Sequence, residues 1–192
     1  MVEAAGVRWS DWEPGVLARA ERLGRFLREQ MTSLEAGVAR YLAPPGEGEK
    51  APHRWLADHA AVAIAYLDLH DATGKGEYLQ WAEETLSDAI SGLYRPEAGG
   101  FLDRLPAAGD FGGLSQPMYP FAPNAHTASA LLRCARATGR EDLFTIGVRT
   151  LCGISVEFDR RGAFAAPYGS ALLLYTKGAP GTTCLPGDPA CA

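Results

Sequence analysis

The stretch "PNAHTASALLRCARATGRE", residues 123–141, decides the fold because an earlier stretch is a variant of it. That earlier stretch is "ADHAAVAIAYLDLHDATGKGE", residues 57–77. Both run through small and apolar residues into Ala-Thr-Gly, pass a basic residue and enter a second apolar segment. At an offset of 65, residues 65–86 lie over residues 130–151. Self-similarity at a fixed offset indicates a stacked helical repeat.

Each repeat predicts two helices joined by a short loop. The first helix of each pair ends at Gly74 or Gly139, because glycine adopts the left-handed backbone conformation at low cost. A loop of a few residues makes the two helices antiparallel neighbours. Over the whole chain the apolar spacing predicts helices at 14–31, 55–73, 77–94, 124–138, 141–157 and 163–176.

The two helices of each pair differ in where their apolar residues lie. Helices 55–73 and 124–138 are rich in small and apolar residues, so we expect them to be buried on most sides. Helices 77–94 and 141–157 carry charged side chains on one face, so we expect them to be half exposed. The predicted core side chains are Leu67, Leu79, Trp81, Leu86, Leu132, Phe144 and Leu151.

This contrast predicts an all-α fold in which antiparallel αα-hairpins form an inner and an outer layer. The architecture is then a partial (α/α)6 toroid of about six helices. An irregular helical bundle is the alternative. The 192 residues favour a single domain, 1–192, with helical repeats over about 14–160 and an irregular tail at 177–192.

Composition excludes several classes of partner. The net charge is −5 and lysines and arginines do not cluster, which argues against nucleic acid and anionic membranes. The longest apolar run is too short to span a bilayer, and the first residues lack the zones of a signal peptide. We therefore expect a cytoplasmic protein.

The cysteines and the short motifs predict neither a metal nor a cofactor. Cys134 and Cys152 lie in apolar helices, while Cys184 and Cys191 lie in the tail, six residues apart and without a histidine beside them. Free thiols are favoured, with a tail disulfide or metal site as the alternatives. Nucleotide-binding loops, zinc-protease motifs and nucleophile elbows do not occur.

Three motifs occur in order along the chain and point to a family. These are "LADHAAVAIAYLDLHDATGKGEYLQWA" (56–82), the Gly-Gly-aromatic piece of "YRPEAGGFLDRL" (94–105) and "APNAHTASALLRCARATG" (122–139). Together, over about residues 15–160, they resemble the C-terminal part of the spermatogenesis-associated thioredoxin-like protein family. The resemblance implies an (α/α)6 toroid similar to N-acylglucosamine 2-epimerases and six-hairpin glycosidases.

The chain also departs from that family. It contains no Cys-x-x-Cys and no preceding thioredoxin-like domain, and Pro-Ser-x-Asn is replaced by "APN" at 122–124. A six-hairpin toroid needs twelve helices, and about half are predicted here. The chain is then a fragment, a shortened relative, or one of two chains that associate.

The candidate site residues are those at the start of the inner helices and after the Gly-Gly turn. Asp58, His59 and Asp103 are the catalytic candidates, because paired carboxylates serve glycosyl chemistry and a histidine can move a proton next to a carbonyl. The candidates for substrate binding are Trp55, Phe101, Asn124 and His126. Each has a structural alternative: helix capping for Asp58 and Asn124, and core packing for His59, Trp55 and Phe101.

Two functions follow, and both are carried forward. The first is a toroid protein with a pocket for a sugar-like small molecule and an unknown activity. The alternative is a non-catalytic interaction module that presents a concave helical face. In either case the open ends of a half-toroid predict a homo-oligomer or a partner polypeptide that covers them, with folding of the tail 177–192 over the last helix as the alternative.

Overall fold

The computed structural model describes residues 14–33, 37–42, 54–107 and 109–178. Within these ranges six helices have 13 or more residues: α1 (Pro14–Phe26), α2 (Leu56–Thr73), α3 (Gly76–Leu93), α4 (Phe121–Thr138), α5 (Glu141–Ile154) and α7 (Ala166–Gly178). A single further turn forms α6 (Phe158–Arg161). The all-α prediction is confirmed, and none of the described helices has the length and apolarity to cross a membrane.

Two antiparallel hairpins, α2–α3 and α4–α5, form the centre of the molecule. Their loops have two residues each, and both begin with a glycine in the left-handed conformation, Gly74 at φ 69° and Gly139 at φ 73°. The Gly74 N–H donates to the carbonyl of His70 at 2.7 Å, and the Gly139 N–H donates to that of Ala135 at 2.8 Å. These bonds satisfy carbonyls at the helix ends, so the predicted stop signals act as expected.

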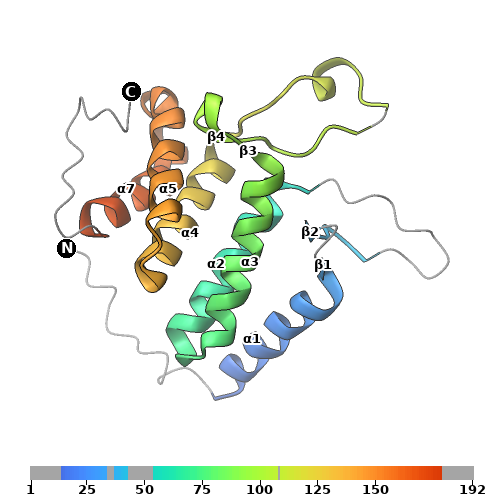
Figure 1. Ribbon diagram of the computed structural model, residues 1–192, viewed down its shortest axis with the longest axis vertical. Helices are drawn as coiled ribbons and strands as arrows, with labels where there is room; N and C mark the ends of the chain where they lie inside the picture. Colours follow the sequence, from blue (N-terminus) through green and yellow to red (C-terminus); the bar gives the residue numbers. More distant parts are fainter. Residues whose placement is uncertain (1–13, 34–36, 43–53, 108, 179–192) are drawn as a thin grey trace.

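The helices lie in two layers. In Figure 1, α3 and α5 lie in front of α2 and α4. Helix α4 packs against α2 on one side and α7 on the other, and α1 contacts α2. Eight of the 18 residues of α2 are buried against six of 18 in α3, and ten of 18 in α4 against six of 14 in α5. Helices 55–73 and 124–138 are therefore the more buried members, as predicted.

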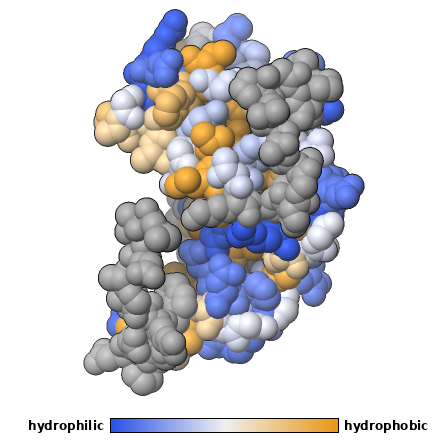
Figure 2. Space-filling view, turned by 90° about the vertical axis from the view of Figure 1, so that its left-hand side faces the viewer, coloured by the Kyte–Doolittle hydropathy of each residue, from blue (hydrophilic) through white to orange (hydrophobic). Residues whose placement is uncertain are grey.

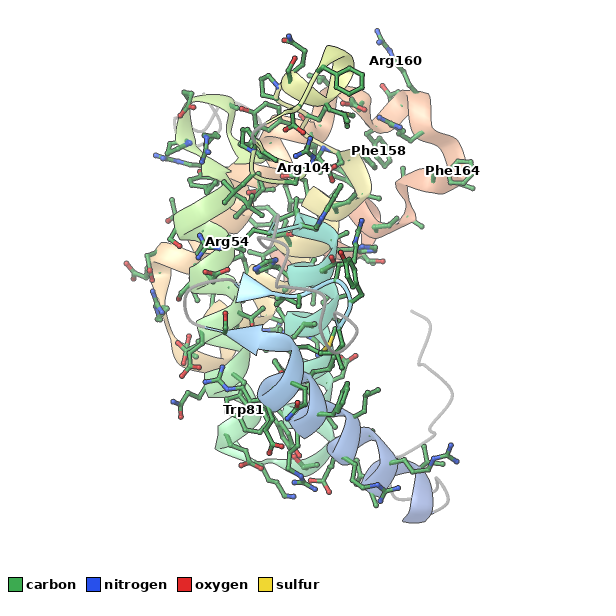
Figure 3. All side chains as sticks on the ribbon, turned by 90° about the vertical axis from the view of Figure 1, so that its right-hand side faces the viewer. Arg54, Trp81, Arg104, Phe158, Arg160 and Phe164 are labelled. Atoms are coloured by element: carbon green, nitrogen blue, oxygen red, sulfur yellow. The ribbon has the colours of Figure 1, made fainter. Side chains whose placement is uncertain are left out.

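The core prediction is confirmed for four leucines, two in the inner helices α2 and α4 and two in the outer helices α3 and α5. Leu67, Leu86, Leu132 and Leu151 are buried. The other three, Leu79, Trp81 and Phe144, are partly buried and pack against the core. These residues lie at the margins of the apolar stripe of an outer helix. Figure 3 shows Trp81 near α1, whose following turn places the Arg28 guanidinium carbon 5.9 Å from its ring centroid.

Two short β-hairpins were not predicted. Strand β1 (Thr32–Ser33) pairs with β2 (Gly37–Val38), and β3 (Tyr94–Arg95) pairs with β4 (Gly100–Phe101), both antiparallel. Each hairpin connects an outer helix to the next inner helix. The predicted helix 14–31 is thus corrected, because its α-helical part ends at Phe26 and a π-helical turn, Leu27–Met31, leads into β1.

The remaining boundaries differ by a few residues. Helix α4 begins before the predicted position 124, since Pro123 is tolerated in a first turn. After α5 a 3-10 turn covers Ser155–Glu157, and another, Gly162–Ala165, precedes α7. Most of the predicted tail, residues 179–192, lies outside the described residues.

Candidate functional site

A hollow of about 250 Å³ lies where α2 begins, and we call it the Trp55 hollow. Its lining residues are Trp55, Leu102, Asp103, Arg104, Pro106, Leu114, Ser115, Gln116, Pro117 and Met118. This volume is just below the range of about 300–1,000 Å³ that is usual for ligand pockets. The hollow therefore suits a small molecule or a single side chain of a partner.

Backbone hydrogen bonds hold the walls of the Trp55 hollow in place. The Leu56 N–H donates to the carbonyl of Asp103 at 2.8 Å, and the Asp103 N–H donates to the carbonyl of Met118 at 2.8 Å. Trp55 and Arg104 form an isolated β-bridge between the same segments. The start of α2 and both arms of loop 102–118 are thus tied together, which fixes Asp103 next to Trp55.

The Arg104 guanidinium stabilises the loop. Its Nη2 lies 2.8 Å from Asp110 Oδ1 and donates to the carbonyl of Leu114 at 3.2 Å, while Nη1 donates to that of Leu105 at 3.0 Å. The hydrogen bond with Asp110 raises the pKa of Arg104. Figure 3 shows Arg104 near the end of the helices that carries this loop. The charge of Arg104 is satisfied within the loop, and these contacts stabilise the loop.

Asp103 is the one carboxylate among the described residues that line the hollow. In the described part of the chain, no hydrogen bond or ion pair involves its carboxylate, and its side chain is only half-buried. The Arg104 guanidinium interacts with the Asp103 carboxylate through its charge. A carboxylate that is held by its backbone and receives no hydrogen bond from a described side chain can accept hydrogen bonds from a ligand.

Asp58, the other predicted carboxylate, is already paired. Arg40 Nε donates to Asp58 Oδ2 at 3.0 Å, and the Arg40 guanidinium carbon lies 4.1 Å from the ring centroid of Trp55. Asp58 does not line the Trp55 hollow. The predicted acid–base pair of Asp58 and Asp103 is therefore not assembled in one pocket.

His59 is fully buried, not exposed to a pocket for substrate. Its Nδ1 lies 2.8 Å from the Trp55 carbonyl, and its Nε2 lies 2.8 Å from Asp88 Oδ2. Asp88 also pairs with Arg54 Nη2 at 2.9 Å. A cavity of about 40 Å³ beside His59 has room for water but not for a sugar. These contacts give His59 a structural position between the two layers.

His59 also contacts the first β-hairpin, and we call this contact the His59 anchor. The Val38 N–H lies 3.4 Å from His59 Nε2. Gly37 has φ 73°, and a Cβ there would lie 2.5 Å from Asp88 Oδ2 and 2.8 Å from His59 Nε2. A glycine is therefore needed for strand β2 to approach the imidazole and the carboxylate so closely.

Asn124 holds the second hairpin through its side-chain amide, and we call this contact the Asn124 anchor. Its Oδ1 accepts from the Phe101 N–H at 2.7 Å, and its Nδ2 donates to the Phe101 carbonyl at 3.0 Å and to the Pro120 carbonyl at 2.9 Å. Asn124 and Phe101 are fully buried. Neither side chain is positioned to contact a ligand at the surface.

The two anchors occupy equivalent positions of the repeat. His59 and Asn124 are 65 residues apart, the offset of the sequence repeat, and each is the fourth residue of its inner helix. Each contacts the second strand of the preceding hairpin, Gly37–Val38 or Gly100–Phe101. The tripeptide "EAG" occurs near both strands: at 35–37 it ends in the first residue of β2, and at 97–99 it comes directly before β4.

Among the predicted site residues, the structure brings Trp55 and Asp103 together in the hollow, with Asp58 connected to Trp55 through Arg40. His126 is exposed on α4, outside the hollow. His59, Phe101 and Asn124 lie in the interior. Arg104, which the sequence placed with Phe101 and Asp103 after the Gly-Gly turn, lies near the Trp55 ring. Arg40, which also lies near this ring, was missed because its segment carries no periodic signal. Within the described residues, no group of three or more metal-ligating side chains could hold a metal ion.

No protein-family model matches this chain, and neither a curated protein nor a solved structure matches it. The structure is that of an all-α protein, with antiparallel αα-hairpins in two layers and a small hollow at the start of one inner helix.

Proposed function

We propose that the chain binds a small sugar-like molecule in the Trp55 hollow. The observation that carries the proposal is the position of an indole ring and the Asp103 carboxylate in one hollow of about 250 Å³. The C–H face of a sugar packs on an aromatic ring, while its hydroxyls donate to carboxylate and amide oxygens. Gln116 adds such an amide to the lining.

The proposal concerns binding rather than turnover. A glycosidase mechanism needs two carboxylates on either side of the scissile bond. Asp58 is paired with Arg40 outside the hollow, and His59 is enclosed by Trp55 and Asp88. Asp103 is the one carboxylate among the residues that the structure describes around the hollow, which supports recognition more than acid–base catalysis. The proposal includes the partial (α/α)6 toroid architecture that the sequence predicts.

The test is a thermal-shift screen with neutral, amino, acidic and phosphorylated monosaccharides, followed by calorimetric titration of any sugar that raises the melting temperature. Asp103→Asn should weaken binding by about 10- to 100-fold, the usual value of a hydrogen bond to a charged group. The exposed Asp159→Asn should leave binding unchanged. A screen in which no sugar raises the melting temperature would refute the proposal.

A second function, an interaction module, is favoured by where the exposed apolar side chains lie. In the described residues they fall into three segments: Val16, Leu23, Phe26, Tyr41 and Leu42 in the first; Phe111, Leu114 and Met118 in the second; and Val156, Phe158, Phe164, Leu172 and Leu173 in the third. The first and third lie at opposite ends of the helix series. The face in Figure 2, on the side of α7, shows apolar surface between polar residues.

Exposed apolar patches of this kind mark contact surfaces on soluble proteins. We propose that these ends contact another polypeptide, with a second copy of the chain as the simplest partner. Light scattering over a concentration series should then show a dimer. Phe164→Ser, at 83% exposure, should weaken it, while Phe111→Ser, at 80% exposure, should not. A monomer at every concentration would contradict the self-association.

A further inference from the structure

The Trp55 ring carries a cation from the same chain. The Arg40 guanidinium carbon lies 4.1 Å from the ring centroid, well inside the 6 Å limit for a cation–π contact. Its Nε donates to Asp58 Oδ2 at 3.0 Å. Trp55 is the N-cap residue of α2 and Asp58 lies in its first turn, and both side chains contact the Arg40 guanidinium group. An indole face and a carboxylate together are a recognised arrangement for organic cations.

The Arg40 contact is exposed and weak. The Arg40 side chain keeps 46% of its surface exposed, and Tyr41 and Leu42 after it are exposed too. An exposed ion pair and an exposed cation–π contact each favour the arrangement in which Arg40 covers the Trp55 ring by a factor of about two to five. Arg104, which also lies near Trp55, is only 11% exposed and holds three loop partners. Of these two arginines, Arg40 is the one that a competitor can displace.

Charge at this end of α2 favours a cation as the competitor. Without Arg40, the Asp58 carboxylate has no ion pair among the described residues, and Asp103 adds a second carboxylate in the hollow beside Trp55. We propose that Trp55 and Asp58 form a binding site for a guanidinium or alkylammonium group, and that Arg40 occupies it as an intramolecular competitor. This inference goes beyond the sugar proposal and does not rest on it, because it needs only the indole ring and the Asp58 carboxylate.

Two sources share this chemistry, a free guanidinium compound and an arginine side chain of a polypeptide. The probes are therefore ethylguanidinium and the blocked peptide Gly-Arg-Gly, with Gly-citrulline-Gly as the uncharged isostere of the peptide. Binding is followed by the NMR signal of the Trp55 indole N–H, assigned with Trp55→Phe. Binding of both probes supports a site for the bare cation, while binding of the arginine peptide alone supports a polypeptide ligand.

The variants Arg40→Ala and Arg40→Met remove the competitor, and the methionine keeps an apolar stem if the alanine disturbs folding. Both should bind the arginine peptide about ten-fold more tightly than the wild type, and Asp58→Asn in the same chain should abolish this gain. Arg28→Ala is the matched control, because Arg28 lies 5.9 Å over Trp81 and pairs with Glu84. It should leave the affinity unchanged. Equal affinity of wild type and both Arg40 variants, or equal binding of the citrulline peptide, would overturn the proposal.

Discussion

Truncation of Asn124 tests whether the anchors hold the fold together. Asn124→Ala removes the acceptor of the Phe101 N–H, at 2.7 Å, and the donor to the Phe101 carbonyl, at 3.0 Å. Both backbone groups belong to a fully buried residue. The Pro120 carbonyl still accepts from the backbone N–H of residue 124 at 3.1 Å, so the loss of its bond from Asn124 Nδ2 adds little.

Each buried polar group left without a partner costs about 1–3 kcal/mol. Two such groups give an expected loss of about 2–5 kcal/mol, allowing for water that enters the space. This is a large part of the about 5–15 kcal/mol that stabilises a typical domain. Urea denaturation followed by circular dichroism measures the loss, provided that the slope of the transition stays unchanged.

His126→Ala is the matched control, since His126 is exposed two residues further along the same helix, and it should change stability by less than about 0.5 kcal/mol. Hydrogen exchange gives a second measurement. Protection of the Phe101 amide should fall at least about 30-fold in Asn124→Ala, the factor that corresponds to about 2 kcal/mol. A loss below about 1 kcal/mol together with unchanged protection of Phe101 would show that the anchor does not hold β4.

Gly37→Ala should destabilise by about 2–4 kcal/mol in urea denaturation, because strain at φ 73° adds to a Cβ clash at 2.5 Å; Gly74→Ala, with φ 69° and open space, should cost about 1 kcal/mol. Equal losses in the two variants would exclude the clash. Leu67→Ala should cost about 2–5 kcal/mol by the same assay, and a loss under about 1 kcal/mol would contradict its place in the core. Burial raises the pKa of the Cys134 thiol to about 12, so peptide mapping after iodoacetamide treatment at pH 8 should find it unmodified in the native protein and alkylated in urea. Burial, with a hydrogen bond to a glutamate, raises the pKa of Tyr78 to about 12; since an unfolded tyrosine ionises near pH 10, stability should fall as the pH rises from about 10 to 12, and less steeply in Tyr78→Phe.

The helices could be predicted because their signals are local. Gly74 and Gly139 each end a helix through their own backbone conformation, and the apolar spacing before and after them sets the faces. The hairpins could not be predicted, because strands of two residues carry no period. The side chains that contact them, His59 and Asn124, lie more than 20 residues away in sequence.

The candidate site also combines local features, which the sequence predicts, with long-range contacts, which it does not. The sequence repeat could show that His59 and Asn124 are equivalent, and it placed both at the start of an inner helix. It could not show that they point inward, because a polar residue in the first turn of a helix can face a pocket or a neighbouring strand equally well. Trp55 and Asp103 came together in the structure through backbone bonds between two loops, for which no sequence pattern exists.

The anchor position also distinguishes the last inner helix, α7, from α2 and α4. The fourth residue of α7 is Gly169, where α2 has His59 and α4 has Asn124. Glycine has no side chain to hold a strand, and in the described residues between α5 and α7 only single helical turns occur. Phe158 and Phe164 lie on these turns, exposed by 42% and 83%, and Figure 3 shows Phe164 at the outer edge of the molecule. Because the third unit lacks an anchor, its connecting segment keeps apolar side chains at the surface, which is the end that the interaction proposal assigns to a second copy.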